Sequence, residues 1–176
     1  VLNDVETRDI KNVAALDIGS NSFHLVVARI VAGSVQIVHS IKQKVRLAAD
    51  LVDGQLTDEG LDRGLASMRI IAESLQGFEP ESVRIVATHT LRRANNARQF
   101  ITQSRNILPY PVEVISGVEE ARLIYSGVAH TAYFEGHRLV IDIGGGSTEF
   151  IIGEGFDTKL CRSLQMGCVS YTKRFF

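Results

Sequence analysis

The chain has 176 residues, of which 45% are hydrophobic and 22% are charged, a composition typical of a globular protein with a core of its own. Its formal net charge of −1 excludes a general attraction to polyanions, so we expect no nucleic-acid partner. No apolar run approaches the length that spans a bilayer, so we expect no transmembrane segment. We expect the protein in the cytoplasm, with peripheral association at the inner membrane as an alternative.

The first part of the chain predicts strands. Residues 1–12 are polar and predict a loose leader. Three β-branched runs follow at 13–18, 23–31 and 34–41, and their short links predict antiparallel pairing, because a parallel return needs a crossover. The basic segment 42–48 is expected to be partly extended.

The middle of the chain alternates between helix and strand. Thr57, followed by two acidic residues and by apolar residues at helical spacing, predicts a helix that ends at Gly77. The next expected elements are a buried strand, an Arg- and Asn-rich helix, a strand and a long helix, at 83–88, 91–106, 112–115 and 117–132.

This order predicts an α/β fold of the ribonuclease-H-like (actin-like ATPase) class, a mixed sheet flanked by helices with right-handed crossovers. The three-strand pattern begins again at 138–143, 147–153 and 157–165, and a last helix is expected near Met166 and Gly167. We therefore expect an N-terminal fragment of a longer protein. It divides into the leader, a complete N-terminal lobe, and a linking helix with the start of a truncated second lobe, over 1–12, 13–123 and 124–176.

One short phrase occurs twice, as ALDIGSNSFHLVV at 15–27 and VIDIGGGSTEFII at 140–152. Alignment of the two copies places Asp17 on Asp142 and Ser22 on Ser147. Each copy predicts a strand, a tight turn of small residues and a returning strand. Two such hairpins that face each other would offer backbone amides and a carboxylate from each wall, which is what chemistry on phosphate needs.

The small residues of both turns are the candidate phosphate ligands, because glycine lets the backbone approach an anion and Ser and Asn add donors. Neither turn contains Lys, so neither is a Walker-type P-loop. A pair of structural hairpin turns is the alternative. The candidates are Gly19, Ser20, Asn21, Ser22, Gly144, Gly145, Gly146 and Ser147.

Asp142 and Glu149 flank the second turn, where the end of one strand lies beside the start of the next. Both carboxylates can therefore point at one Mg²⁺, which takes few protein ligands and keeps several waters. Asp17 is the expected third acid. A solvent-facing strand position is the alternative for Glu149.

Ser116 and Glu119 fit a capping box at the start of the long helix, which leaves Glu120 without a structural role. A cleft-facing carboxylate at Glu120 could take a proton from an attacking water, although two solvated glutamates near a helix start are the alternative. Arg92 and Arg93 follow a buried strand and could reach a phosphate, or lie on a solvated helix face.

With these residues assembled, the chain resembles the exopolyphosphatase and guanosine pentaphosphate phosphohydrolase family of the actin-like superfamily. The resemblance extends from about residue 13 to 176 and is carried by DIGSNSFHLVV, VRLA, ATHTLR, ISGVEEARLIYSGV, VIDIGGGSTE and MGCVS. It implies that Glu120 is the general base, that Asp142 and Glu149 bind magnesium, and that Arg92 contacts phosphate.

The resemblance implies metal-dependent release of terminal phosphate from inorganic polyphosphate, with guanosine pentaphosphate (pppGpp) as the alternative substrate. The exopolyphosphatase branch is favoured because the other branch tends to have alanine where His89 and Gly146 stand here. It also implies a homodimer at full length, and the fragment alone is expected to lack activity. A kinase-like or chaperone-like ATPase and a non-catalytic phosphate sensor or scaffold remain as alternatives of other classes.

Overall fold

The structure is a computed structural model that describes residues 10–132 and 134–176. Most of the expected leader, residues 1–9, lies outside the described residues. Residues 10–12 belong to the first strand, which therefore begins earlier than the sequence pattern predicts.

The first sheet has five strands in the order β3-β2-β1-β6-β7. The first three strands are antiparallel neighbours, whereas β1 pairs in parallel with β6 and β6 with β7. This mixed sheet is the ribonuclease-H-like arrangement that the element order predicts. The strands are β1 (Ile10–Ile18), β2 (Ser22–Val31), β3 (Ser34–Lys44), β6 (Val83–Ala87) and β7 (Val112–Val114).

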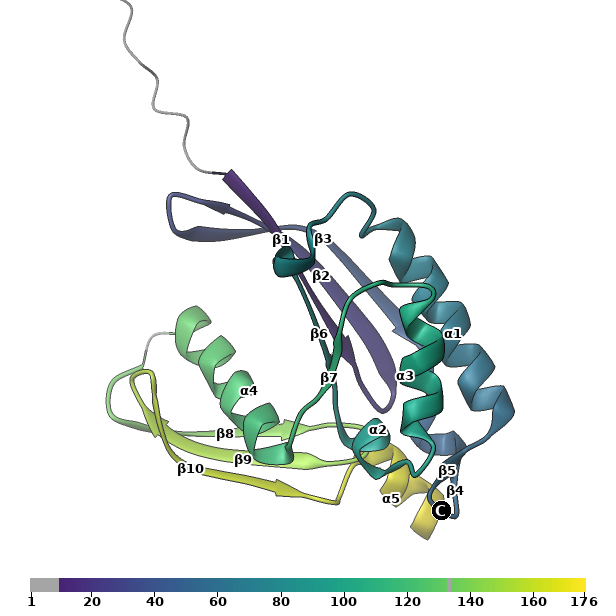
Figure 1. The fold of residues 1–176 in the computed structure, drawn as a ribbon. Helices are drawn as coiled ribbons and strands as arrows, with labels where there is room; N and C mark the ends of the chain where they lie inside the picture. Colours follow the sequence, from purple (N-terminus) through teal and green to yellow (C-terminus); the bar gives the residue numbers. More distant parts are fainter. Residues whose placement is uncertain (1–9, 133) are drawn as a thin grey trace, which may run out of the picture.

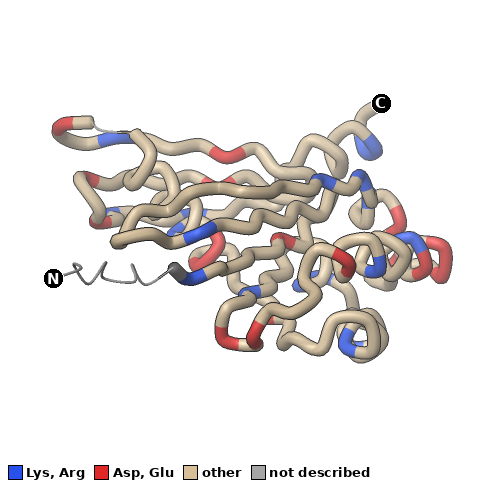
Figure 2. The backbone as a smooth tube through the Cα atoms, turned by 90° about the horizontal axis from the view of Figure 1, so that it is seen from above, with Lys and Arg blue, Asp and Glu red and all other residues tan. Residues whose placement is uncertain are grey.

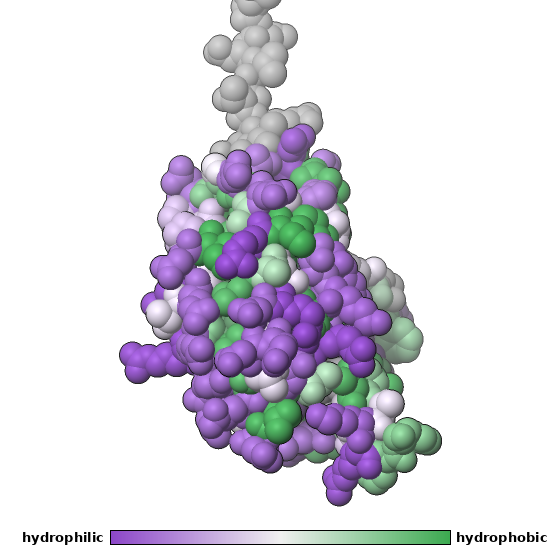
Figure 3. All heavy atoms as spheres, turned by 90° about the vertical axis from the view of Figure 1, so that its right-hand side faces the viewer, coloured by the Kyte–Doolittle hydropathy of each residue, from purple (hydrophilic) through white to green (hydrophobic). Residues whose placement is uncertain are grey.

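Two helices, α1 (Asp58–Glu73) and α3 (Ala97–Arg105), lie beside this sheet (Figure 1). Their apolar faces and the sheet enclose the main core, in which Phe23 and Phe100 meet edge to face with ring centroids 6.2 Å apart. The Thr57 hydroxyl accepts a hydrogen bond from the Gly60 amide at 3.2 Å and starts α1 as predicted. The side of the molecule on which α1 lies, facing away from this core, is mostly hydrophilic (Figure 3).

The helix expected over 91–106 is wrong, because the structure has two helices there, α2 (His89–Arg93) and α3. The Asn96 side chain accepts from the Leu56 amide and donates to the Leu56 carbonyl, both at 2.9 Å, and so pairs with the backbone of a short hairpin. The chain leaves the helix at Ala94, which is extended (φ −75°, ψ 122°), and the Asn95 amide then donates to the Gly54 carbonyl at 2.7 Å. That hairpin, β4 (Leu51–Val52) and β5 (Gln55–Leu56), and the 3₁₀ turns η1 (Leu47–Asp50) and η2 (Pro80–Ser82) were not predicted.

The second sheet has three antiparallel strands in the order β10-β9-β8, as the repeated pattern predicts. They are β8 (His137–Ile143), β9 (Thr148–Glu154) and β10 (Asp157–Leu164). Helix α4 (Gly117–Thr131) packs on β9 and β10 with Ala121 and Tyr125 against Ile151, and α5 (Cys168–Phe175) follows. The boundary expected between 123 and 124 falls inside α4, so it divides a single helix; the division into lobes stays a prediction.

Acidic and basic positions are interspersed along the chain rather than gathered by sign (Figure 2). This agrees with the small net charge, so a site for a polyanion has to be built locally. In the part of the chain that the structure describes, no helix is long and apolar enough to cross a membrane.

Candidate active site

The two repeated turns have the same backbone geometry. In the first, the Gly19 amide donates to the Ser22 carbonyl at 3.2 Å; in the second, the Gly144 amide donates to the Ser147 carbonyl at 2.9 Å. The equivalent strand positions are also paired alike, Asp17 opposite His24 and Asp142 opposite Glu149. The repeat is therefore one strand-turn-strand unit made twice.

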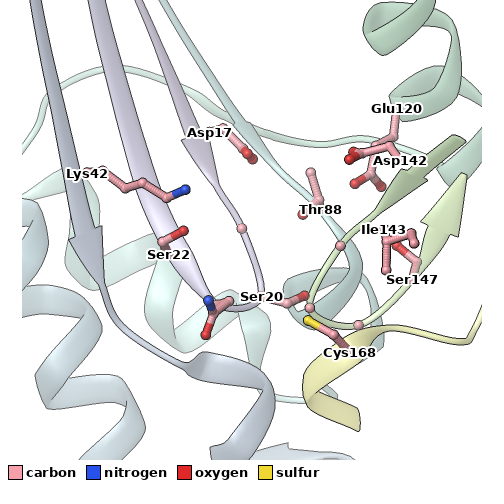
Figure 4. Close-up of a pocket in the computed structure, with 15 residues that line it drawn as sticks. Asp17, Ser20, Ser22, Lys42, Thr88, Glu120, Asp142, Ile143, Ser147 and Cys168 are labelled. Atoms are coloured by element: carbon pink, nitrogen blue, oxygen red, sulfur yellow. The ribbon is translucent and has the colours of Figure 1, made fainter. Parts of the chain in front are cut away.

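The two turns meet and face one cavity of about 280 Å³ (Figure 4). A Cβ placed on Gly145 would lie 3.1 Å from the Cβ of Asn21, so the turns are in van der Waals contact. All eight candidate phosphate ligands line the cavity: Gly19, Ser20, Asn21, Ser22, Gly144, Gly145, Gly146 and Ser147. The two turns therefore share one cavity and do not point to opposite sides of the molecule, and phosphate binding by them stays a prediction.

Several amides of these turns have no acceptor among the described residues: those of Ser20, Asn21, Gly145 and Gly146. Backbone amides without a partner at the wall of a cavity can donate to an anion. Since the amides come from both turns, an oxyanion between the turns could accept from both walls.

Hydrogen bonds from neighbouring segments of the chain hold carbonyl groups of the same turns. The Asn21 carbonyl accepts from the amides of Val45 and Arg46 at 3.0 and 2.8 Å. The Gly144 carbonyl accepts from the Cys168 amide at 2.9 Å, so the start of α5 holds the second turn. The turns are thus held in place before any ligand arrives, which reduces the cost of binding.

Asp17, Glu120 and Asp142 direct their carboxylates into the same space (Figure 4). Asp17 keeps contact with solvent in the cavity but is enclosed by protein on its other sides; this burial, and then the charge of Asp142, raise its pKa to about 6. Burial first, and then the charge of Glu149, raise the pKa of Glu120 to about 7, against the opposing effect of Arg92. A carboxyl group with a pKa near neutrality, in a cavity, is suited to proton transfer.

Glu149 is fully buried and does not line the cavity, so the alternative of a solvent-facing strand residue is excluded. The Ser163 hydroxyl donates to its Oε1 at 2.7 Å, whereas Oε2 has no hydrogen-bond partner among the described residues. Its position opposite Asp142 places both carboxylates at one end of the second sheet.

The structure does not assemble the three expected acids into a ligand cluster. Among the described residues, no three His, Cys, Asp or Glu side chains gather closely enough to hold a metal ion alone. Asp17 stands on the first sheet, whereas Asp142 and the unpartnered oxygen of Glu149 stand on the second. Magnesium commonly takes one or two carboxylates together with substrate oxygens, so the latter pair fits such an ion without Asp17.

Arg92 lies behind Glu120 and does not line the cavity. Its guanidinium donates to the Ile115 carbonyl at 2.7 Å and to Oε2 of Glu120 at 3.2 Å from both terminal nitrogens. Glu120 is thereby fixed, with 15% of its side chain exposed. A contact between Arg92 and phosphate stays a prediction.

The half of the capping box that Ser116 supplies is confirmed, because its hydroxyl accepts from the Glu119 amide at 3.1 Å. The Glu119 carboxylate turns to Arg122 instead, with two hydrogen bonds of 2.8 Å. The two adjacent glutamates therefore differ: Glu119 pairs on the surface and Glu120 faces the cavity.

Four residues of the cavity were not among the predicted site residues: Lys42, Thr88, Ile143 and Cys168. Lys42 extends its ammonium group toward the cavity from β3 (Figure 4). Thr88 is buried at the end of β6, and two residues on, the Thr90 hydroxyl donates to that of Ser20 at 2.8 Å. The basic segment 42–48 and the motif ATHTLR were the available signals.

We expect Lys42→Gln to weaken phosphate binding about tenfold or more, because a charge-assisted contact to an anion contributes roughly 1.5–3 kcal/mol. Lys42 is exposed and has no ion-pair partner among the described residues, so stability should not change. Titration calorimetry with inorganic phosphate measures the loss, and Lys11→Gln, an exposed lysine at the far end of β1, is the control. Equal affinities of both variants would contradict the assignment.

Sequence comparison relates this chain to a family of phosphatases. Residues 26–176 match the Ppx/GppA phosphatase family. Over its whole length the chain is 48% identical to a Haemophilus influenzae protein that is provisionally named an exopolyphosphatase. The match covers 55% of that protein. The chain thus spans about half the length of this curated relative.

Two solved structures have the same fold over nearly the whole chain. The Aquifex aeolicus PPX-GPPA enzyme is 34% identical with a TM-score of 0.81, over 95% of this chain and 56% of that one. An exopolyphosphatase from Cytophaga hutchinsonii is 30% identical with a TM-score of 0.85, over 94% and 54% of the two chains.

Proposed function

Because the chain belongs to the Ppx/GppA phosphatase family, we propose that it forms the catalytic N-terminal part of an exopolyphosphatase, which hydrolyses the terminal phosphoanhydride bond of inorganic polyphosphate. One observation carries the proposal: two glycine turns with unpartnered amides face a single cavity that also contains the Glu120 carboxylate. The provisional name of the Haemophilus influenzae relative supports polyphosphate as the substrate.

In the proposed reaction the amides of both turns and Lys42 hold the terminal phosphoryl group by its oxygens. Glu120 accepts a proton from a water molecule while the water oxygen forms a bond to phosphorus. The bridging P–O bond breaks, its electron pair stays with the shortened polyphosphate, and orthophosphate is released. Arg92 keeps the Glu120 carboxylate in position through its two hydrogen bonds.

We propose that Mg²⁺ is the cofactor. Asp142 and Glu149 would hold it, since a buried carboxylate oxygen without a partner, such as Oε2 of Glu149, needs a cation or a proton. When bound, the ion neutralises charge on the phosphate oxygens. Asp17 contributes a carboxylate on the opposite wall, where it can orient waters.

The direct test measures orthophosphate release by the protein at its relatives' full length, from polyphosphate, pppGpp and ATP, with Mg²⁺ and with a chelator. We expect the highest kcat/KM with polyphosphate and loss of release with the chelator. A preference for pppGpp would move the protein to the other branch of the family, and a preference for ATP would favour a kinase-like or chaperone-like ATPase. A protein that binds these compounds without releasing phosphate would be a sensor.

A further inference from the structure

Another cavity, of about 320 Å³, lies where α2, the start of α4 and the end of β10 meet (Figure 1). We call it the rear pocket, and we call the cavity between the two glycine turns the phosphate cavity. The two cavities share no lining residue, so they are separate spaces. A ligand in the rear pocket would therefore leave the phosphate cavity open to substrate.

Two residues that line the rear pocket hold carboxylates of the active site. The Arg92 guanidinium donates to Oε2 of Glu120 at 3.2 Å from both terminal nitrogens. The Ser163 hydroxyl donates to Oε1 of Glu149 at 2.7 Å. The rear pocket thus lies one side chain away from the proposed general base and from a proposed metal ligand.

The charge of the rear pocket has one sign. Three arginines line it and no acidic residue of the described chain does: Arg92, Arg93 and Arg162. In the part of the chain that the structure describes, neither Arg93 nor Arg162 belongs to an ion pair. The Arg162 side chain donates only to the Cys161 carbonyl, at 3.0 Å. A solvated surface of ordinary composition mixes both signs, whereas this pocket offers cations alone.

Arg92 keeps donors for a ligand while it holds Glu120. Its Nε has no acceptor among the described residues, and its Nη2 donates to Glu120 alone. On the same wall, the amides of Gly117 and Val118 in the first turn of α4 also have no described acceptor. A Cβ on Gly117 would lie 2.5 Å from the Cβ of Ser163 and 3.6 Å from Nη2 of Arg92. Guanidinium and amide donors are therefore close together at this wall.

Forked guanidinium donors and backbone amides match the oxygens of a tetrahedral oxyanion, and three positive charges favour a multiply charged ion over a monocarboxylate. We propose that the rear pocket binds a second inorganic oxyanion of the orthophosphate class, and that this ion lowers kcat by drawing Arg92 away from Glu120. A misplaced catalytic group slows a reaction even when substrate still binds. The binding goes beyond the proposed function, whereas the effect on kcat rests on it, because orthophosphate is the product of that reaction.

The binding test follows amide chemical shifts of the chain without metal, during titration with inorganic phosphate. We expect the amides of Gly117 and Val118 to shift with a Kd of their own, different from the Kd at Gly145 in the phosphate cavity. In the double variant Arg93→Gln with Arg162→Gln, the Kd at the first two amides should rise about tenfold or more. The Kd at Gly145 should stay within about twofold.

The control is Arg69→Gln with Arg105→Gln, which removes the same charge from exposed positions on α1 and α3 and should change neither Kd by more than about twofold. The binding is overturned if the amides of Gly117 and Val118 stay unshifted while that of Gly145 saturates, or if the control raises their Kd as much as the variant does. Shifts at these two amides without a shift at Gly145 would support the rear pocket and contradict the proposed function.

The effect on kcat is tested by inhibition of the protein at its relatives' full length, with loss of polyphosphate as the readout. Added orthophosphate should lower kcat of the unaltered protein as well as raise KM. The Arg93→Gln, Arg162→Gln variant should keep the uninhibited kcat, and only the rise in KM should remain. Purely competitive inhibition of the unaltered protein, or an equal fall of kcat in both proteins, would overturn this effect. If the unaltered protein hydrolyses no polyphosphate, the proposed function fails and the effect on kcat fails with it, while the shifts at Gly117 and Val118 still decide the binding.

Discussion

Replacement of Glu120 by Gln is expected to lower kcat for orthophosphate release about 10²–10⁴-fold, the usual contribution of a general base, while polyphosphate still binds. Gln keeps the size of the side chain and can still accept from Arg92, but it cannot take up a proton at neutral pH. The measurements are steady-state kinetics and calorimetry on the protein at its relatives' full length.

The pH dependence follows from the same carboxyl group. Since the pKa of Glu120 is raised to about 7, kcat/KM of the unaltered protein should rise with pH through that range. The raised pKa also means that the ionised side chain costs the folded state stability. This cost is absent below the ordinary pKa of 4.5, grows as the pH rises and is complete above about 7. Glu120→Gln should therefore be at least as stable as the unaltered protein at pH 8, which separates lost catalysis from misfolding.

Glu119→Gln is the matched control, because Glu119 is the adjacent residue and pairs with Arg122 on the surface. We expect its kinetics to equal those of the unaltered protein. If Glu120→Gln keeps most of its rate, or if both variants lose activity alike, Glu120 is not the base.

Replacement of Gly146 by Ala is expected to lower the free energy of unfolding by about 1–3 kcal/mol, as overpacking of a filled interior does. A Cβ at Gly146 would lie 2.2 Å from Nδ1 of His89, far inside contact distance. The second phosphate turn must then shift, and displacement of a site by about 1 Å can cost roughly 10² in rate. Chemical denaturation and phosphate release report the two effects.

His89→Ala should relieve the clash, so the double variant should be more stable than the sum of the two single variants predicts, by about 1 kcal/mol or more. Burial, followed by the charges of Arg92 and Arg93, lowers the pKa of His89 to about 4, so the ring is neutral at pH 7. Neither ring nitrogen has a hydrogen-bond partner among the described residues, so the single replacement of His89 removes packing and no hydrogen bond.

Gly127→Ala is the control for added volume at a glycine. Apart from the backbone of its own helix, nothing lies within 4 Å of a Cβ at this position, and Gly127 is inside helix α4, where Ala stabilises by about 0.5–1 kcal/mol. Strictly additive effects of Gly146→Ala and His89→Ala in the denaturation experiment would show that the two residues do not press on each other.

Much of the site could be predicted from the repeat. A duplicated strand-turn-strand phrase with Asp in the same register predicts two equivalent turns, and the structure pairs Gly19 with Ser22 as it pairs Gly144 with Ser147. The capping motif of α4 was half right, because Ser116 caps the helix but the Glu119 carboxylate pairs with Arg122. The resemblance singled out His89 and Gly146, and in the structure a Cβ added at Gly146 would meet the His89 ring; the choice between the two branches stays a prediction.

Features that depend on distant contacts could not be predicted. Between α2 and α3, the Asn96 side chain pairs with the Leu56 backbone 40 residues away. Spacing alone could not tell that Arg92 turns toward Glu120, or that Glu149 is buried, because both depend on how α4 and the second sheet pack. Lys42 reaches the cavity only because β3 lies beside β2, at the edge of the sheet.

The central claim is that both glycine turns bind one phosphate group between them. Amide chemical shifts of the chain, titrated with inorganic phosphate, test it directly. We predict that the amides of Ser20 and Asn21 and those of Gly145 and Gly146 shift together, with a single apparent Kd. Shifts confined to one turn, or different Kd values for the two turns, would contradict it.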